Sequence, residues 1–204
     1  IQKLKSNRKD LKMGRIIHGN QSFGYAPIVT GENDSPKFGT PVMLAGMVSS
    51  TIEVEQDTTS IYADNEVYCK VKGAKVRTAE VAFRYISKEY AEFLGFKLNQ
   101  NGMLTDTGDF ANHCFFFETV EEDCTTGTET RTLHYLYNVK GAEPTKETST
   151  DEEEVEAMEL SVEYTASESD FVIDDNGKKC QYGYITRTEQ NATVYDTFKQ
   201  KVLL

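Results

Sequence analysis

The sequence predicts a mainly β protein: an antiparallel β-sandwich or barrel with one flanking short α-helix and extended loops or arms. Apolar residues recur mostly with a period of two, which is the spacing of a half-buried strand. The 204 residues include 11 Tyr and 11 Phe, which supply large side chains for one core. Strand-like segments follow one another without alternating helices, and this order argues against a parallel sheet.

A basic segment at the start of the chain differs from everything after it. Residues 1–15 carry six basic residues and one acidic residue, whereas the remaining chain holds 16 basic and 32 acidic residues. Because residues 1–13 are polar and lack a hydrophobic period, we expect a basic, disordered N-terminal extension followed by a single domain over residues 14–204. A body this acidic is a poor candidate for gripping nucleic acid, since such binding depends on neutralising phosphates. Solubility alone would also explain the charge.

Strands dominate the first half of the predicted domain. Residues 15–29 mix β-forming residues with Gly and Pro, and a turn cluster follows at 31–36. The segment 38–65 then holds a Gly-Thr-Pro entry, an apolar run and the alternating sequence Ile-Glu-Val-Glu at 52–55. We expect strands at 42–44 and 48–54, a polar link after them, and further strands at 66–71 and 75–86. In the last of these, one face carries Arg77, Ala79, Val81, Phe83 and Tyr85, and the opposite face carries Val76, Thr78, Glu80, Ala82 and Arg84.

One short helix interrupts the strands. Ser87 is placed as an N-cap, Tyr90, Phe93 and Leu94 share one helical face, and Gly95 stands where glycine ends a helix. Two turns are marginal in isolation, so we expect this helix to pack its aromatic face on a sheet.

Hairpins and turns dominate the second half. Asn101-Gly102 and the Asp-Asn-Gly sequence at 175–177 are turn signals. Strands are expected at 112–120, 131–139, 155–164 and 182–188, and a terminal helix at 193–202. Two apolar faces are predicted: Leu133, Tyr135, Tyr137 and Val139 on one strand, and Met158, Leu160, Val162 and Tyr164 on another.

Residues suited to catalysis or metal binding form no known motif. None of the three histidines, at 18, 113 and 134, lies in a hydrolase or metalloprotease sequence pattern. The four cysteines include no C-x-x-C pair, and their spacing from the histidines is too wide for a zinc knuckle. We therefore expect no enzyme, no cofactor, no metal and four free buried thiols. There is also no apolar run long enough to span a membrane and no signal-type segment near the start, which favours a soluble protein made in a cytoplasm.

An ordered series of short motifs resembles the major tail proteins, or tail tube proteins, of bacteriophages with long non-contractile tails. The resemblance covers roughly residues 14–204, although family members often carry Trp where this chain has Thr197-Phe198, and residues 1–12 have no counterpart. The motifs are Gly24-Tyr25-Ala26-Pro27, Phe38-Gly39-Thr40-Pro41, Ala45-Gly46-Met47-Val48-Ser49, Tyr62-Ala63-Asp64-Asn65, Leu94-Gly95-Phe96-Lys97-Leu98, Asn101-Gly102-Met103-Leu104, Tyr137-Asn138-Val139 and Thr193-Val194-Tyr195-Asp196-Thr197-Phe198.

The resemblance implies a structural virion protein that self-assembles. Six copies would form a ring, and rings would stack into a hollow tail tube that later conducts double-stranded DNA without binding it specifically. The implied partners are further copies of the chain, a tape-measure protein inside the tube, and the tail terminator and distal tail proteins at its ends. Assembly would occur in the host cytoplasm, no membrane is involved, and the family has no catalytic residues.

A DNA conduit benefits from a wall that repels phosphate. We therefore expect some strand acids to face the lumen; the candidates are Glu53, Glu55, Glu80, Glu159 and Glu163. The alternative function is a β-sandwich module that binds a ligand such as carbohydrate, against which the absence of Trp counts.

Overall fold

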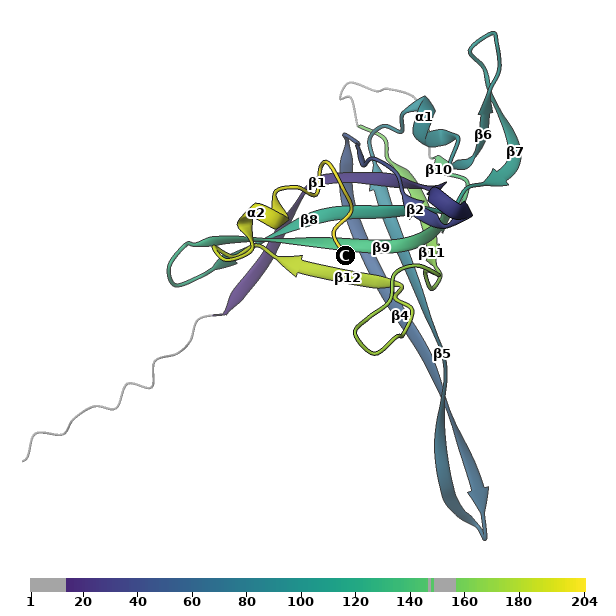
Figure 1. The fold of residues 1–204 in the computed structure, drawn as a ribbon, viewed down its shortest axis with the longest axis vertical. Coiled ribbons are helices and arrows are strands. Elements are labelled where there is room, and N and C mark those ends of the chain that lie inside the picture. The colour runs from purple at the N-terminus through teal and green to yellow at the C-terminus, as the bar shows by residue number, and fades with distance from the viewer. Residues whose placement is uncertain (1–13, 147, 149–156) are drawn as a thin grey trace, which may run out of the picture.

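The computed structural model describes residues 14–146, 148 and 157–204. The predicted N-terminal extension, residues 1–13, lies outside them. The described chain is mainly β with antiparallel pairing throughout, as the sequence predicted (Figure 1). The strands are β1 (Arg15–Thr30), β2 (Pro36–Phe38), β3 (Val42–Met43), β4 (Met47–Ala63), β5 (Glu66–Phe83), β6 (Leu94–Leu98), β7 (Leu104–Phe110), β8 (His113–Asp123), β9 (Glu129–Gly141), β10 (Thr145–Lys146), β11 (Leu160–Ala166) and β12 (Tyr182–Thr186).

One large sheet curls over to form two packed layers. Its central path runs β2-β1-β8-β9-β11-β5-β4, with β12 paired to β9, whereas β6 and β7 form a separate hairpin. Figure 1 shows β4 and β5 crossing behind β1, β8 and β9. The first core lies between these layers, and it includes Phe23, Phe115, Val81, Phe83 and Tyr164.

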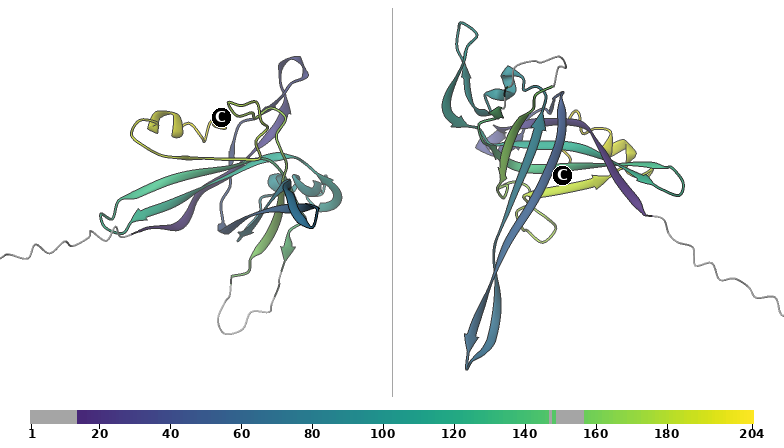
Figure 2. Two further views of the ribbon diagram at one scale, coloured as in Figure 1. Left: turned by 90° about the horizontal axis from the view of Figure 1, so that it is seen from below. Right: turned by 180° about the vertical axis from the view of Figure 1, so that it is seen from behind.

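A second core lies on the opposite face of β1, β8 and β9. There the C-terminal segment, residues 192–204, covers the sheet, and the left view of Figure 2 shows it beside that face. The segment contributes Tyr195, Phe198, Val202 and Leu203, which pack on side chains of β8 and β9. Strand β8 is therefore buried on both faces, and each of its residues from 113 to 118 is less than 9% exposed.

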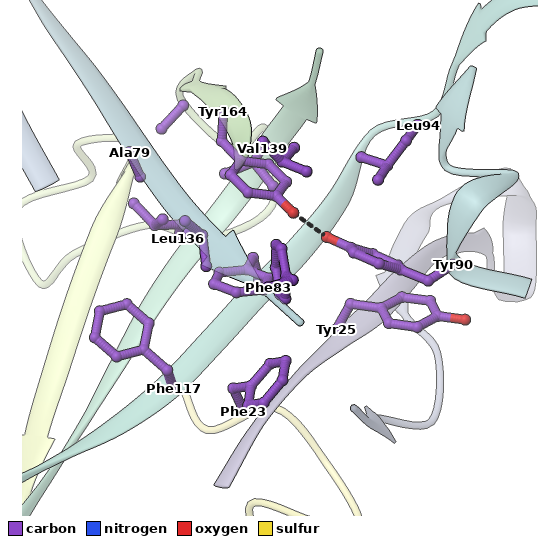
Figure 3. Packing of buried hydrophobic residues seen from close by; sticks show 14 residues of the cluster. Phe23, Tyr25, Ala79, Phe83, Tyr90, Leu94, Phe117, Leu136, Val139 and Tyr164 are labelled. Atoms are coloured by element: carbon purple, nitrogen blue, oxygen red, sulfur yellow. Dashed lines mark hydrogen bonds between the residues drawn. The ribbon is translucent and has the colours of Figure 1, made fainter. Parts of the chain in front are cut away.

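The first core also contains a polar chain, and Figure 3 shows one of its bonds, between Tyr90 and Tyr164. The carbonyl of Ala111 can only accept, so it takes the Nδ1–H of His113 at 2.9 Å and leaves Nε2 of a neutral ring as the acceptor. Tyr90 Oη then donates to that Nε2 at 3.0 Å, and Tyr164 Oη donates to Tyr90 Oη at 2.7 Å. These bonds fasten the helix that carries Tyr90 to the sheet.

The predicted short helix is present as a single turn, α1 (Lys88–Ala91). Ser87 Oγ accepts the Tyr90 N–H at 3.2 Å, so the predicted N-cap is confirmed. The helix ends earlier than expected, because Leu94 and Gly95 belong to β6. A 3-10 turn, η1 (Glu32–Asp34), lies in the predicted turn cluster.

The terminal helix is shorter than predicted. Only α2 (Ala192–Tyr195) is helical, and Asn191 gives it no side-chain cap. Turns follow, and Tyr195, Phe198 and Val202 are buried while Val194 is 54% exposed. So short a helix depends on tertiary packing, which here favours a wrapped segment over a straight helix. No helix among the described residues has the length and apolar character of a membrane span.

A bulge in β9 corrects one predicted face. Between His113↔Val139 and Phe115↔Leu136, β9 has one residue more than β8. The extra residue reverses the alternation, so Val139 joins the first core while Leu133, Tyr135 and Tyr137 join the second. On β11, Val162 and Tyr164 are buried as predicted, whereas Met158, which precedes β11, is 40% exposed.

Candidate assembly surfaces

A long two-stranded hairpin is the most extended feature of the described chain. Strand β4 continues through the stretch predicted to be a polar link, and β5 unites the two strands expected at 66–71 and 75–86. Figure 1 and the right view of Figure 2 show both strands running well past the body. We call residues 57–74, beyond the Gln56↔Lys75 pair, the hairpin arm.

The turn at the tip explains why the arm closes. Asp64 and Asn65 have φ of 51° and 63°, and they connect the Ala63↔Glu66 pair. Two consecutive positive φ values match a type I′ turn, whose twist suits a hairpin, and Asp and Asn tolerate this region. The Asp-Asn pair is therefore a local sequence signal for this hairpin, although no hairpin was predicted here.

The arm keeps large apolar side chains in solvent. No residue from 53 to 76 is buried. Clustered apolar exposure of this kind, on strands with no covering layer, is typical of a surface that meets a partner. The exposed fractions are 46% for Ile61, 67% for Tyr62, 47% for Val67, 76% for Tyr68 and 50% for Val71.

The outward face of β4, β5 and β11 gathers the predicted lumen acids. Glu53 and Glu55 lie on β4, Glu80 on β5, and Glu163 on β11, with Glu159 just before β11 at the same alternation. All five are exposed, and the opposite side of these strands faces the first core. The structure thus brings together five acids that the sequence spreads over more than 100 positions, and we call their surface the acidic face.

Two acids on this face stand directly opposite each other. Glu80 pairs with Glu163 across β5 and β11. Like charges at directly opposite positions lower the stability of a sheet, so folding stability alone does not explain this pair. Ser161 Oγ donates to Glu80 Oε1 at 2.7 Å, and Arg84 Nη2 lies 3.2 Å from Glu159 Oε1. Glu159 is the one acid of the five that has an ion-pair partner among the described residues.

A polar groove runs along the acidic face. It has a volume of about 740 Å³ and is lined by side chains that include Ser49, Thr51, Glu80 and Ser161. A second hollow beside it also holds Glu143, an acid that the sequence analysis left out because it lies in an irregular loop.

The histidines and cysteines form no candidate site. His113 is fully buried, and burial lowers its pKa to about 4, with a smaller opposing effect from the Ala111 carbonyl. Burial also lowers the pKa of His134, so both rings are neutral near pH 7. In the part of the chain that the structure describes, no three His, Cys, Asp or Glu residues are grouped to hold a metal ion. All four cysteines are free as predicted, but only Cys114 is buried, and Cys124 is exposed.

Comparison with known proteins identifies the family. A family model described as phage tail tube protein matches residues 7–203. Tail tube proteins of Lactococcus phages p2 and SK1 are each 28% identical over 180 residues, and that of Lactococcus phage F4-1 is 29% identical. These matches cover 83% of this chain and 60% of each relative, so the chain spans less than two thirds of their length. The chain belongs to the phage tail tube protein family, and it is a structural protein and not an enzyme.

Proposed function

We propose that copies of this chain assemble into hexameric rings, that the rings stack into the hollow tube of a phage tail, and that double-stranded DNA passes through the bore without specific binding. The observation that carries the proposal is the hairpin arm with its exposed apolar side chains. A monomer gains nothing from these exposed groups, whereas a neighbouring copy would bury them. The ring number of six rests on the family resemblance.

The acidic face supports a role as the tube wall. A lumen lined with cations would hold the genome by releasing counterions from its phosphates, whereas carboxylates repel it. We propose that some of Glu53, Glu55, Glu80, Glu159 and Glu163 line the bore. The opposed Glu80 and Glu163 fit this role, because a wall that must repel phosphate gives a functional reason to keep two like charges at a destabilising position.

The family also suggests the other components that this chain meets. We propose a tape-measure protein within the tube, a tail terminator and distal tail proteins at its ends, and a location in the virion tail after assembly in the host cytoplasm. Contacts with these proteins would use the ends and the inner wall of the rings, whereas contacts between copies would use the arm.

Electron microscopy of the purified protein tests the assembly. We expect rings or tubes with a central hole for the wild type, and none for a Tyr62→Ser, Tyr68→Ser double variant of the arm. Tyr85→Ser is the matched control, because Tyr85 is 63% exposed but lies outside the arm. A persistent monomer that binds glycan would support the carbohydrate-binding alternative. If the arm variant forms tubes as well as the wild type does, the arm does not contribute to the contact between copies.

The lumen assignment needs a separate measurement. A tube reconstruction should place some of the five acids on the inner wall, and a map with all of them on the outer wall or between rings would refute it. In solution, tubes of a Glu53→Lys, Glu163→Lys variant should retain double-stranded DNA at low salt and release it at high salt. Glu89→Lys, Glu92→Lys changes the charge equally at α1 and should leave DNA retention unchanged.

A further inference from the structure

Arg77 is a buried cation at the foot of the hairpin arm. It lies on β5 in line with Ala79, Val81 and Phe83, where the first core ends, and only 8% of its surface is exposed. Its guanidinium carbon lies 4.2 Å from the centre of the Tyr182 ring on β12. Tyr182 is itself held in place, because its hydroxyl lies 2.7 Å from His134 Nδ1. The aromatic ring covers the flat face of the guanidinium and leaves its N–H edge for another group.

No group among the described residues satisfies that edge. The buried Nε–H of Arg77 has no hydrogen-bond partner, and no carboxylate there lies within ion-pairing distance of the guanidinium. A buried charge is rarely tolerated without a partner, and burial lowers the pKa of Arg77 accordingly. The buried His113 differs, because its ring is neutral and has two hydrogen-bond partners.

The guanidinium borders a cavity with a basic lining. Its volume of about 190 Å³ equals the share of roughly six liquid waters, which suits a carboxyl side chain. Lys75, Lys178 and Lys179 line it together with Arg77. The two acids of the lining are Glu168 and Asp174, and Asp174 already accepts the N–H groups of Asn176 and Lys178. Lys179 is already paired with Asp170, so Arg77, Lys75 and Lys178 carry the positive charge of the cavity, in a chain with a formal charge of −11.

We propose that this cavity is a carboxylate-binding site and that an Asp or Glu side chain of a second copy fills it in the assembled protein. The planar N–H fork of arginine matches the two oxygens of a carboxylate, and such a pair is strongest where water is excluded. The chain holds 33 acidic residues against 22 basic ones, so a neighbouring copy presents carboxylates to a rare basic hollow. The choice of occupant rests on the self-assembly proposed above.

The first test uses the unassembled protein at low concentration. We expect Arg77→Met to unfold at the same temperature as the wild type or a higher one, because methionine removes a buried charge that has no partner in the monomer. In NMR spectra, acetate added at constant ionic strength should shift the Arg77 Nε–H signal saturably. The Arg187 signal should not move, because Arg187 already pairs with Asp196 through two hydrogen bonds.

The second test measures the protein concentration at which assembly begins, by sedimentation. Arg77→Met should raise that concentration by at least about tenfold, and Arg77→Lys, which keeps the charge but not the fork, by less. Arg15→Met removes the same charge from an exposed position and should change it by less than about twofold.

The outcomes separate the site from the proposed function. A monomer of Arg77→Met that is less stable while assembly is unchanged would show that Arg77 only packs on Tyr182, and this would overturn the proposal. If acetate binds but Arg77→Met does not change assembly, the cavity binds small free anions, and the proposal that a carboxylate of a second copy fills it is overturned. If the wild type never assembles, the proposed function fails, and the acetate titration alone then supports or overturns the carboxylate site.

Discussion

The β8–β9 and β4–β5 hairpins are both antiparallel, but β8 is buried in the body whereas the arm of β4–β5 is exposed. β8 packs between two cores, and its residues 113–118 are buried on both faces. The arm of β4–β5 also forms an antiparallel ladder, with register shifts at Gln56/Thr58 and Ile61/Tyr62, yet no residue of it is buried. Backbone hydrogen bonds alone therefore do not distinguish the two. Isolated two-stranded hairpins are marginal in water, and the proposed contact with a neighbouring copy would supply the packing that the arm lacks.

Matched aromatic truncations should show the largest contrast. Phe116→Ala in β8 leaves a cavity in the second core and should lower the free energy of unfolding by about 3–5 kcal/mol. Tyr68→Ala in the arm removes a side chain that is 76% exposed and should cost less than about 0.5 kcal/mol in the monomer. Urea unfolding of both variants measures the contrast, and equal losses would mean that the arm is part of the folded core.

Acid should weaken β8 more than the arm. The folded-state pKa of His113 is about 4, below the ordinary 6.5, because burial disfavours the charged ring. Its contribution to stability is therefore complete above pH 6.5 and is lost as the pH falls toward 4, by about 3 kcal/mol. The difference in unfolding free energy between the wild type and His113→Gln should shrink over that range. A difference that stays constant from pH 7 to pH 4 would contradict the buried neutral ring.

Removing one hydroxyl should give an intermediate effect. Tyr195 Oη donates to Glu118 Oε1 at 2.8 Å, and Glu118 is 1% exposed with its other oxygen unpartnered among the described residues. Tyr195→Phe leaves this carboxylate without its bond and should cost about 1–3 kcal/mol. Thermal unfolding measures the loss. Tyr184→Phe is the control, because Tyr184 is 68% exposed, and it should change stability by less than about 0.5 kcal/mol.

The smallest effect is expected at the tip of the arm. Asn65→Gly relieves the positive φ of 63° and should stabilise the turn by a few tenths of a kcal/mol. Hydrogen exchange of amides in the arm should slow, whereas the global unfolding free energy stays within about 0.5 kcal/mol, because the arm opens separately from the body. A global shift above 1 kcal/mol would show that the arm and body unfold together.

Much of the body follows from local patterns in the sequence. The alternation in β5 correctly predicts that Ala79, Val81 and Phe83 share one face, which the structure shows to be buried, and Ser87 correctly marks the start of α1. Local patterns fail where distant contacts decide. The bulge that turns Val139 to the first core depends on the register with β8, and the C-terminal segment wraps because the second core binds it.

The candidate surfaces were only partly predictable. Alternation shows that the five acids point away from apolar neighbours, but strand order is what places them on one face. Arg77 has no local signal at all, because an arginine in line with core residues is explained only once Tyr182, more than 100 residues later, lies against it.

The cysteines give the two hairpins a natural chemical label. Cys69 lies half-buried on the arm, paired with Ile61, and Cys124 is exposed where β8 turns toward β9. Cys114 is fully buried, and burial raises the pKa of its thiol, so it reacts last with an alkylating reagent. If copies associate as proposed, loss of alkylation at Cys69 or at Cys124, with each modified thiol identified separately from Cys180, would show which hairpin becomes shielded, without any substitution.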